Sequence, residues 1–332
     1  MMEDRKQHGP AIVALGGGQG LSAILRGLKL YTENLTAIVT VADDGGGSGV
    51  LREDLGMPPP GDIRSCMEAL ADTESMMRKL MAYRFTEGRL AGQAFGNLLL
   101  AALTGISDSF DHAVARMGEV LAITGRILPV TNADVTLEAT FENGTSVRGE
   151  SKIFDFKKQQ NCRIHHVRLL PENSPALPDA LEAIRRADVI LLGPGSLYTS
   201  VIPNLLVDGI SEAIQESHAL KIYVCNIMTQ DGETEGMTAC DHVSALLEHG
   251  GPGLVDLCLC NSARLDSGML ERYSKEDAAP MVIDREAVEL LGVEVVSRPL
   301  TEEQSDYARH SGVKVAEAVL ELYRQRADTR IF

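Results

Sequence analysis

The chain has 332 residues, of which 44% are hydrophobic and 23% are charged, an ordinary composition for a folded protein of one large or two moderate domains. The formal net charge is −16 and aromatic residues make up only 4%, which argues against a nucleic-acid polymer as partner, because a polyanion is repelled and finds few rings for stacking. No apolar run approaches the ~20 residues of a membrane span, and the polar residues 1–10 do not resemble a signal peptide. We therefore expect a cytoplasmic protein without membrane insertion.

Short apolar runs, glycine-rich turns and helical segments alternate in the first 130 residues. Apolar runs at 11–15 and 35–41 predict buried strands, because each is short and bounded by turn residues. Apolar residues at helical spacing predict helices at 21–30, 62–70, 74–85, 97–104 and 110–121.

The middle of the chain has a different pattern. Apolar and polar residues alternate at 134–141, and an Asn143-Gly144 pair then precedes a second run at 145–150. This pattern predicts an antiparallel hairpin with a tight turn, to which 163–169 could add a strand.

Strands and helices alternate again after residue 170. The expected helices are 177–186, 204–216, 238–249, 284–291 and 311–324, and the expected strands are 188–192, 221–225, 254–260 and 293–296. Such alternation predicts a parallel sheet with helices on both faces. We expect a three-layer αβα, Rossmann-like, doubly wound α/β fold with an antiparallel hairpin extension. It would form one domain, 1–332, with an N-terminal half (1–130), a hairpin insertion (131–170) and a C-terminal half (171–332).

The turn after the first strand is rich in glycine. Read from Gly18, it matches G-x-G-x-x-A, with Gly20 and Ala23. Glycines let the backbone approach an anion, and a helix start offers free N–H groups and a positive dipole end. A tight turn that only packs the helix on the sheet is the alternative. The candidate phosphate-binding residues are Gly16, Gly17, Gly18, Gln19 and Gly20.

Two adjacent carboxylates, Asp43 and Asp44, follow the second strand and precede another glycine run. Either could hold a ribose hydroxyl, coordinate Mg²⁺ or act as a base in an enzyme. A surface turn is the alternative, since Asp-Gly is common turn chemistry. The candidate residues are Asp43, Asp44, Gly45, Gly46 and Ser48.

Three further segments add polar groups near the same strand ends. Asp62 could cap a helix or contact a ligand, and Arg64 could clamp a phosphate. The loops 193–200 and 226–234 each follow a predicted strand, and the carboxyl ends of parallel strands form the edge where open α/β folds bind ligands. Their candidate residues are Gly193, Pro194, Gly195, Ser196, Ser200, Asn226, Met228 and Thr229.

The six cysteines are scattered and contain no C-x-x-C pair. Cys258 and Cys260 alternate within an apolar run, as two residues on one face of a strand would. We interpret the cysteines as buried reduced thiols rather than a zinc site.

The ordered glycine, aspartate and asparagine motifs, with Gly96-Asn97 between them, resemble the YvcK-type gluconeogenesis-factor family, which is related to the 2-phospho-L-lactate transferases (CofD). The resemblance covers about residues 11–322. It implies a usually dimeric protein that binds a UDP-sugar and supports cell shape and cell-wall homeostasis during gluconeogenic growth. It also implies that Asn97, Tyr273 and Arg309 belong to the ligand site. Gln19 and Asp231 stand where the family commonly has Thr and Pro, which bears on ligand choice.

Three functions remain open from the sequence. The first is a regulator that binds UDP-N-acetylglucosamine, UDP-glucose or another nucleotide diphosphate without turnover. The second is a metal-dependent transferase of a phosphate-linked group, with Asp43 and Asp44 placing Mg²⁺ or activating an acceptor. The third is an NAD-dependent enzyme, suggested by the G-x-G-x-x-A match; NAD could also occupy a UDP-sugar site opportunistically, because both carry a nucleotide diphosphate.

Overall fold

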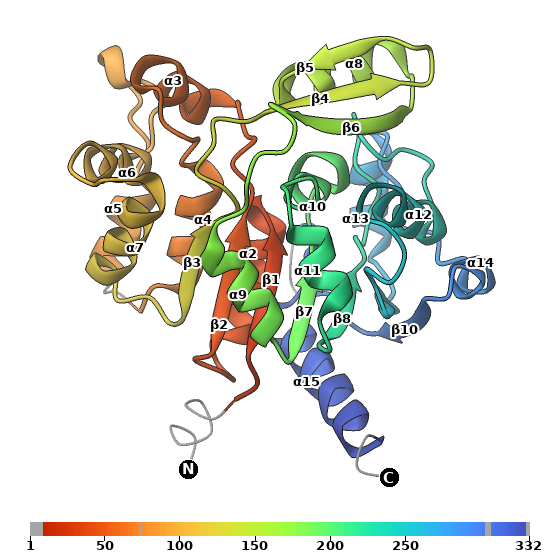
Figure 1. Ribbon diagram of the computed structural model, residues 1–332. Coiled ribbons are helices and arrows are strands. Elements are labelled where there is room, and N and C mark those ends of the chain that lie inside the picture. Colours follow the sequence, from red (N-terminus) through yellow and green to blue (C-terminus); the bar gives the residue numbers. More distant parts are fainter. Residues whose placement is uncertain (1–8, 73–74, 303–306, 330–332) are drawn as a thin grey trace.

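The computed structural model describes residues 9–72, 75–302 and 307–329 (Figure 1). Its centre is a seven-stranded sheet in the order β10-β9-β8-β7-β1-β2-β3, in which all neighbouring strands are parallel. The strands are β1 (Ile12–Gly16), β2 (Leu35–Val39), β3 (Arg126–Pro129), β7 (Val189–Leu192), β8 (Leu220–Val224), β9 (Leu257–Asn261) and β10 (Glu294–Arg298). The predicted doubly wound α/β fold is confirmed.

Helices cover both faces of this sheet (Figure 1). On one face, α2 (Gly18–Leu28) packs against α4 (Gly61–Leu70) and α15 (Gly312–Thr329). The other face carries α9 (Pro178–Arg186), α10 (Ile202–Leu205), α11 (Ile210–Glu216) and α12 (Ala239–Gly250). The remaining helices are α3 (Gly46–Leu55), α5 (Ser75–Ala82), α6 (Phe95–Gly105), α7 (Phe110–Val120), α8 (Glu150–Gln160), α13 (Ser267–Ser274) and α14 (Arg285–Leu290).

The central strands are mainly apolar because helices bury both of their faces. Every residue of β1, β2, β7 and β8 is buried, so these strands lack the alternation of a half-exposed sheet. The chain order reverses between β1, which pairs with β2, and β7 on its other side. That reversal places the loops after β1 and β7 side by side at the carboxyl edge, where doubly wound folds bind their ligands.

A small antiparallel sheet lies beyond this carboxyl edge (Figure 1). It has the order β5-β4-β6, with β4 (Thr136–Phe141), β5 (Ser146–Arg148) and β6 (Ile164–Leu170). The hairpin prediction is confirmed, but the segment also contains α8 between β5 and β6. The insertion therefore contributes a helix as well as strands above the candidate site.

Several elements were not predicted. Helix α3 begins within the glycine run after Asp44, where low helix propensity conceals it. The expected helix 204–216 is divided into α10 and α11 by Gly209, whose φ is +87°. Helices α8 and α13 and strand β3 were also missed. Two predictions fall partly outside the described residues. The polar segment 1–10 includes residues 1–8, and the expected helix 74–85 begins at Glu74.

Within the described ranges, no helix combines the length and the apolarity that crossing a membrane requires.

Candidate functional site

A cavity of about 860 Å³ lies at the carboxyl edge where β1 and β7 meet, and we call it the nucleotide cavity. That volume falls within the range of small-molecule sites. The loops after β1, β7 and β8 form one side, and α13 with the segment before α15 forms another. The predicted residues that line it are Gly17, Gly18, Gln19, Gly20, Pro194, Gly195, Ser196, Ser200, Asn226, Met228, Thr229, Tyr273 and Arg309.

The first glycine loop forms the cavity wall at the start of α2. Gly18 has a φ of +62°, which favours glycine. A Cβ on Gly20 would overlap the carbonyl oxygen of Pro194, so this glycine permits the close approach of the two loops. Helix α2 has no capping side-chain bond at Gly17 and no acidic residue in its first turn. Its N-terminus therefore offers N–H groups to an anion.

Asp62 lies at the same helix start. Its carboxylate accepts a hydrogen bond from the backbone of Gly18, but burial raises its pKa to about 7, with a further contribution from the charge of Asp43. A bound phosphate would therefore share these N–H groups with the Asp62 carboxylate, or it would bind when that carboxyl is protonated and uncharged.

The second loop is held in place by side chains from the loop after β8. The Asn226 side chain accepts a hydrogen bond from Gly195 N at 3.2 Å and donates one to Gly195 O at 2.9 Å. Ser196 Oγ donates to Gln230 Oε1 at 2.9 Å. Because these contacts join two loops, they fix the loop that faces Gly20.

Cationic and aromatic groups lie at the other end of the nucleotide cavity. The Tyr273 hydroxyl accepts a hydrogen bond from Ala308 N at 3.1 Å, and the Arg309 guanidinium lies 5.5 Å from the centre of the Tyr307 ring. Arg26 lines the same cavity. Tyr273 and Arg309, which the family resemblance implicated, thus share one cavity with both glycine loops.

A second cavity of about 300 Å³ adjoins the first, and we call it the acidic cavity. Both cavities are lined by Phe154, Ser196 and Gln230. Asp43, Glu150 and Glu233 face the acidic cavity. A ligand bound along the glycine loops would therefore lie beside a group of carboxyls.

Two of these carboxyls, Glu150 and Glu233, have raised pKa values. Burial, followed by the charges of Asp43 and Asp62, raises the pKa of Glu150 to about 9. Burial also raises the pKa of Glu233 to about 7, although its carboxylate accepts hydrogen bonds from Tyr198 N at 2.9 Å and Thr199 N at 3.0 Å. At neutral pH Glu150 is therefore protonated, and its proton can bridge to Asp43, with which it forms a hydrogen bond.

Asp43 and Asp44, which the sequence suggested as one pair, have different surroundings. Asp43 Oδ1 accepts a hydrogen bond from Gly45 N at 2.8 Å, and its side chain faces the acidic cavity. Asp44 Oδ1 instead accepts a hydrogen bond from Ser151 N at 2.9 Å, in the first turn of α8. Asp43 therefore shares a hydrogen bond with Glu150 and lies close enough to Asp62 to raise its pKa. Asp44 instead contacts helix α8 of the insertion.

Arg64 and Asn97 lie together, but neither is among the residues that line the nucleotide cavity or the acidic cavity. Arg64 Nε donates to Asn97 Oδ1 at 2.9 Å, and the guanidinium also binds Glu68. Gly193 and Gly46 line neither cavity, and Ser48 is buried against Gly61. Gly16 ends β1 behind the loop, whereas Gly45 lines the acidic cavity.

Sequence reasoning missed several lining residues. Glu150 lay in a segment expected to be a strand, and Glu233 was one acid within a polar loop. Lys158 comes from the unpredicted α8 and pairs with Asp231 at 2.6 Å. For Asp231 the family resemblance gave the one signal, because an aspartate stands at a position where the family commonly has proline.

Comparisons of sequence and of structure both group this chain with the same family of proteins. The sequence profile of the family described as 2-phospho-L-lactate transferase CofD matches residues 12–301. The gluconeogenesis factor of Halalkalibacterium halodurans is 47% identical over 311 residues, covering 93% of this chain and 95% of the relative. That of Bacillus subtilis is 46% identical over 317 residues, covering 95% and 99%. A crystal structure of a Bacillus halodurans protein matches with a TM-score of 0.90 and 46% identity, covering 94% of this chain and 99% of that one.

Proposed function

The chain belongs to the 2-phospho-L-lactate transferase CofD family, with the gluconeogenesis factors as its relatives, and from this premise we propose that it is a regulatory protein that binds a UDP-sugar. UDP-N-acetylglucosamine and UDP-glucose are the proposed ligands. In this proposal the protein acts in the cytoplasm. It supports cell shape and cell-wall homeostasis during gluconeogenic growth.

One observation carries the proposal: both glycine loops, Tyr273 and Arg309 line a single cavity of about 860 Å³. Backbone N–H groups at the start of α2 suit a diphosphate. An arginine can pair with the same group, and a tyrosine ring offers a face for a uracil or a sugar. Groups of the kind that each part of a nucleotide-sugar needs line this one cavity, which supports the proposal.

Calorimetric titration of the purified protein tests this proposal. UDP-N-acetylglucosamine, UDP-glucose and NAD are each titrated with and without Mg²⁺. We expect saturable binding of a UDP-sugar, with the ligand recovered intact. Replacing Arg309 with alanine should weaken binding about tenfold or more, because a charge-assisted contact is lost. Arg186→Ala is the matched control, since Arg186 is exposed and pairs with Glu182 in α9. Binding of NAD alone would contradict the proposal.

The acidic cavity supports a second candidate function, a metal-dependent transferase of a phosphate-linked group. Asp43 and Glu150, which share a hydrogen bond, supply oxygen donors of the kind that Mg²⁺ binds. A cation beside them would relieve the charge repulsion that adds to burial in raising the Glu150 pKa. Asp44 differs from Asp43 in its contacts, because its Oδ1 accepts a hydrogen bond from Ser151 N of α8. Bound Mg²⁺ would neutralise phosphate charge. Formation of a metal-dependent product, detected by mass spectrometry and lost in Asp43→Asn, would favour the transferase.

The family resemblance also predicts a homodimer. Sedimentation velocity of the full chain, with and without UDP-N-acetylglucosamine, measures its mass directly. A monomer under both conditions would contradict this prediction.

A further inference from the structure

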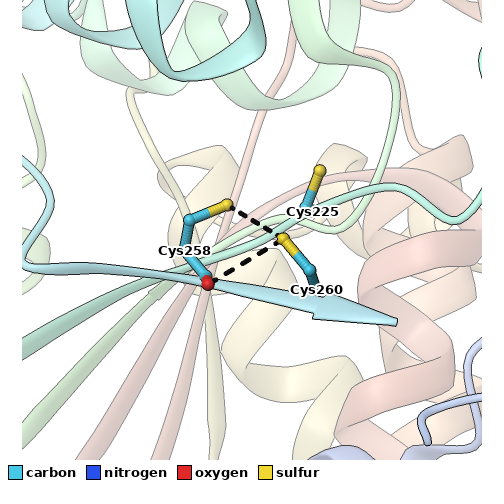
Figure 2. A group of neighbouring side chains, drawn as sticks. All are labelled: Cys225, Cys258 and Cys260. Carbon is cyan, nitrogen blue, oxygen red and sulfur yellow. Dashed lines mark hydrogen bonds between the residues drawn. The ribbon is translucent and has the colours of Figure 1, made fainter. Parts of the chain in front are cut away.

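Three cysteine side chains meet at a place separate from the acidic cavity. Figure 2 shows Cys225, Cys258 and Cys260 side by side, with a dashed line joining the sulfur atoms of Cys258 and Cys260. All three are buried and none forms a disulfide. The Sγ atoms of Cys258 and Cys260 are 3.6 Å apart, and all three Sγ atoms lie within 4.8 Å of one another. No other group of three Cys, His, Asp or Glu ligands within the described part of the chain meets this spacing.

Strand register brings the three thiols together. Tyr223 of β8 pairs with Cys258 of β9, and Val224 pairs with Leu259. The next residue, Cys225, therefore lies beside Cys260, and residues paired in this way share a face of the sheet. Cys258 and Cys260 are two residues apart, so they also share that face. The cluster was invisible in the sequence because its third member comes from another strand.

The sulfur spacing suits one metal ion. Zinc–sulfur bonds are about 2.3 Å long, so three sulfurs around one ion lie about 3.8 to 4.0 Å apart. The spacing in the structure, from 3.6 Å to at most 4.8 Å, spans this value. Side-chain shifts of less than about 1 Å would bring the three sulfurs to these separations.

A separate cavity gives access to the thiols. It has a volume of about 200 Å³, and Cys225 and Cys260 both line it. Its other lining residues are mainly apolar and include Met281, whose thioether is a further soft donor. A water molecule or this thioether could therefore occupy a fourth position.

We propose that Cys225, Cys258 and Cys260 form a binding site for a thiophilic metal ion with a filled d shell, Zn²⁺ or Cu⁺. Thiolates favour these ions over Mg²⁺ or Ca²⁺. Each coordinating thiol gives its proton to solvent as its metal–sulfur bond forms, and no electron is transferred.

Metal titration of the reduced full-length chain tests the site. Zn²⁺ is added in competition with a chromophoric chelator, and Cu⁺ is added anaerobically in the same way. We expect one ion per chain for at least one of the two metals. The double variant Cys258→Ser/Cys260→Ser should bind about 100-fold more weakly or not at all. The matched control Cys162→Ser/Cys240→Ser lies outside the cluster and should bind as the unaltered chain does.

A second measurement does not depend on variants that fold. Cd²⁺ added to the unaltered chain should give a thiolate-to-metal charge-transfer absorption of the strength expected for three bound sulfurs. Failure of both Zn²⁺ and Cu⁺ to bind would overturn the proposal. So would an absorption that corresponds to fewer than three sulfurs, or a control pair that loses binding as the cluster variant does.

Discussion

Gly20 sets how closely the two ligand loops approach each other. A Cβ at this position would overlap the backbone carbonyl of Pro194, so Gly20→Ala must push the loops apart. We predict that this substitution weakens UDP-sugar binding by about 1–3 kcal/mol, the usual cost of forcing extra atoms into a packed site. Calorimetric titration measures the change.

The control for this prediction is Gly105→Ala. Gly105 ends α6, and a Cβ there would have no neighbour within 4 Å. Binding should be unaltered in this variant. If Gly20→Ala also bound like the unaltered chain, the assignment of the glycine loop to the ligand would be wrong.

At the residue scale, the sequence predicted the glycine loops better than the carboxylates. A glycine run after a buried strand indicates close backbone approach whatever the rest of the fold does. The surroundings of Asp43 and Asp44 depend instead on α8, which the sequence did not reveal. Glu150 gave no signal as a single acid, because its role comes from burial beside Asp43.

The crossing of α2 and α15 depends on two glycines. A Cβ on Gly27 would overlap the carbonyl of Gly312, and one on Gly312 would overlap the carbonyl of Ala23. We predict that Gly27→Ala lowers the free energy of unfolding by about 3 kcal/mol, because neither backbone can yield without moving a helix. Urea unfolding measures this loss. An unchanged midpoint would show that the helices are not held in this contact.

Asp44 connects the parallel sheet to α8 of the insertion. Helix α8 has no side-chain cap of its own at Gly149, and Asp44 accepts the bond from Ser151 N instead. We predict that Asp44→Ala costs about 1 kcal/mol, as the loss of a helix cap does. Hydrogen exchange of the first α8 amides should accelerate. Asp54→Ala, at an exposed position in α3, is the control and should leave α8 protection unchanged.

At the element scale, burial on both faces made the parallel strands predictable. Short, mainly apolar runs located β1, β2, β7 and β8. The missed helices have weaker patterns: α3 begins with glycines, and α8 is a polar helix in which only two residues, Ile153 and Lys157, are buried. Tertiary contacts decide such elements more than local propensity does.

The interior of the molecule holds several carboxyls and imidazoles whose pKa values are shifted in the direction that favours the uncharged form. Three acids have raised pKa values: Asp62 at about 7, Glu233 at about 7 and Glu150 at about 9. Three histidines, His242, His249 and His310, have pKa values lowered to about 4 by burial. The histidines oppose stability only where the unfolded chain would protonate them, below about pH 6.5. Above that pH the histidines no longer contribute to the trend.

Glu150 contributes to the change of stability in alkaline solution. Between its unfolded pKa, near the ordinary 4.5, and its folded pKa of about 9, Glu150 binds a proton only in the folded chain. The free energy of unfolding therefore falls as pH rises through this window, by at most about 1.4 kcal/mol per pH unit for one group. We predict a continuous decline between about pH 7 and 9, and a shallower one in Glu150→Gln, which is neutral in both states. Urea unfolding across that range measures both slopes. Equal slopes would mean that Glu150 is already ionised in the folded protein, and the acidic cavity would then hold two charges beside its ligand instead of a shared proton.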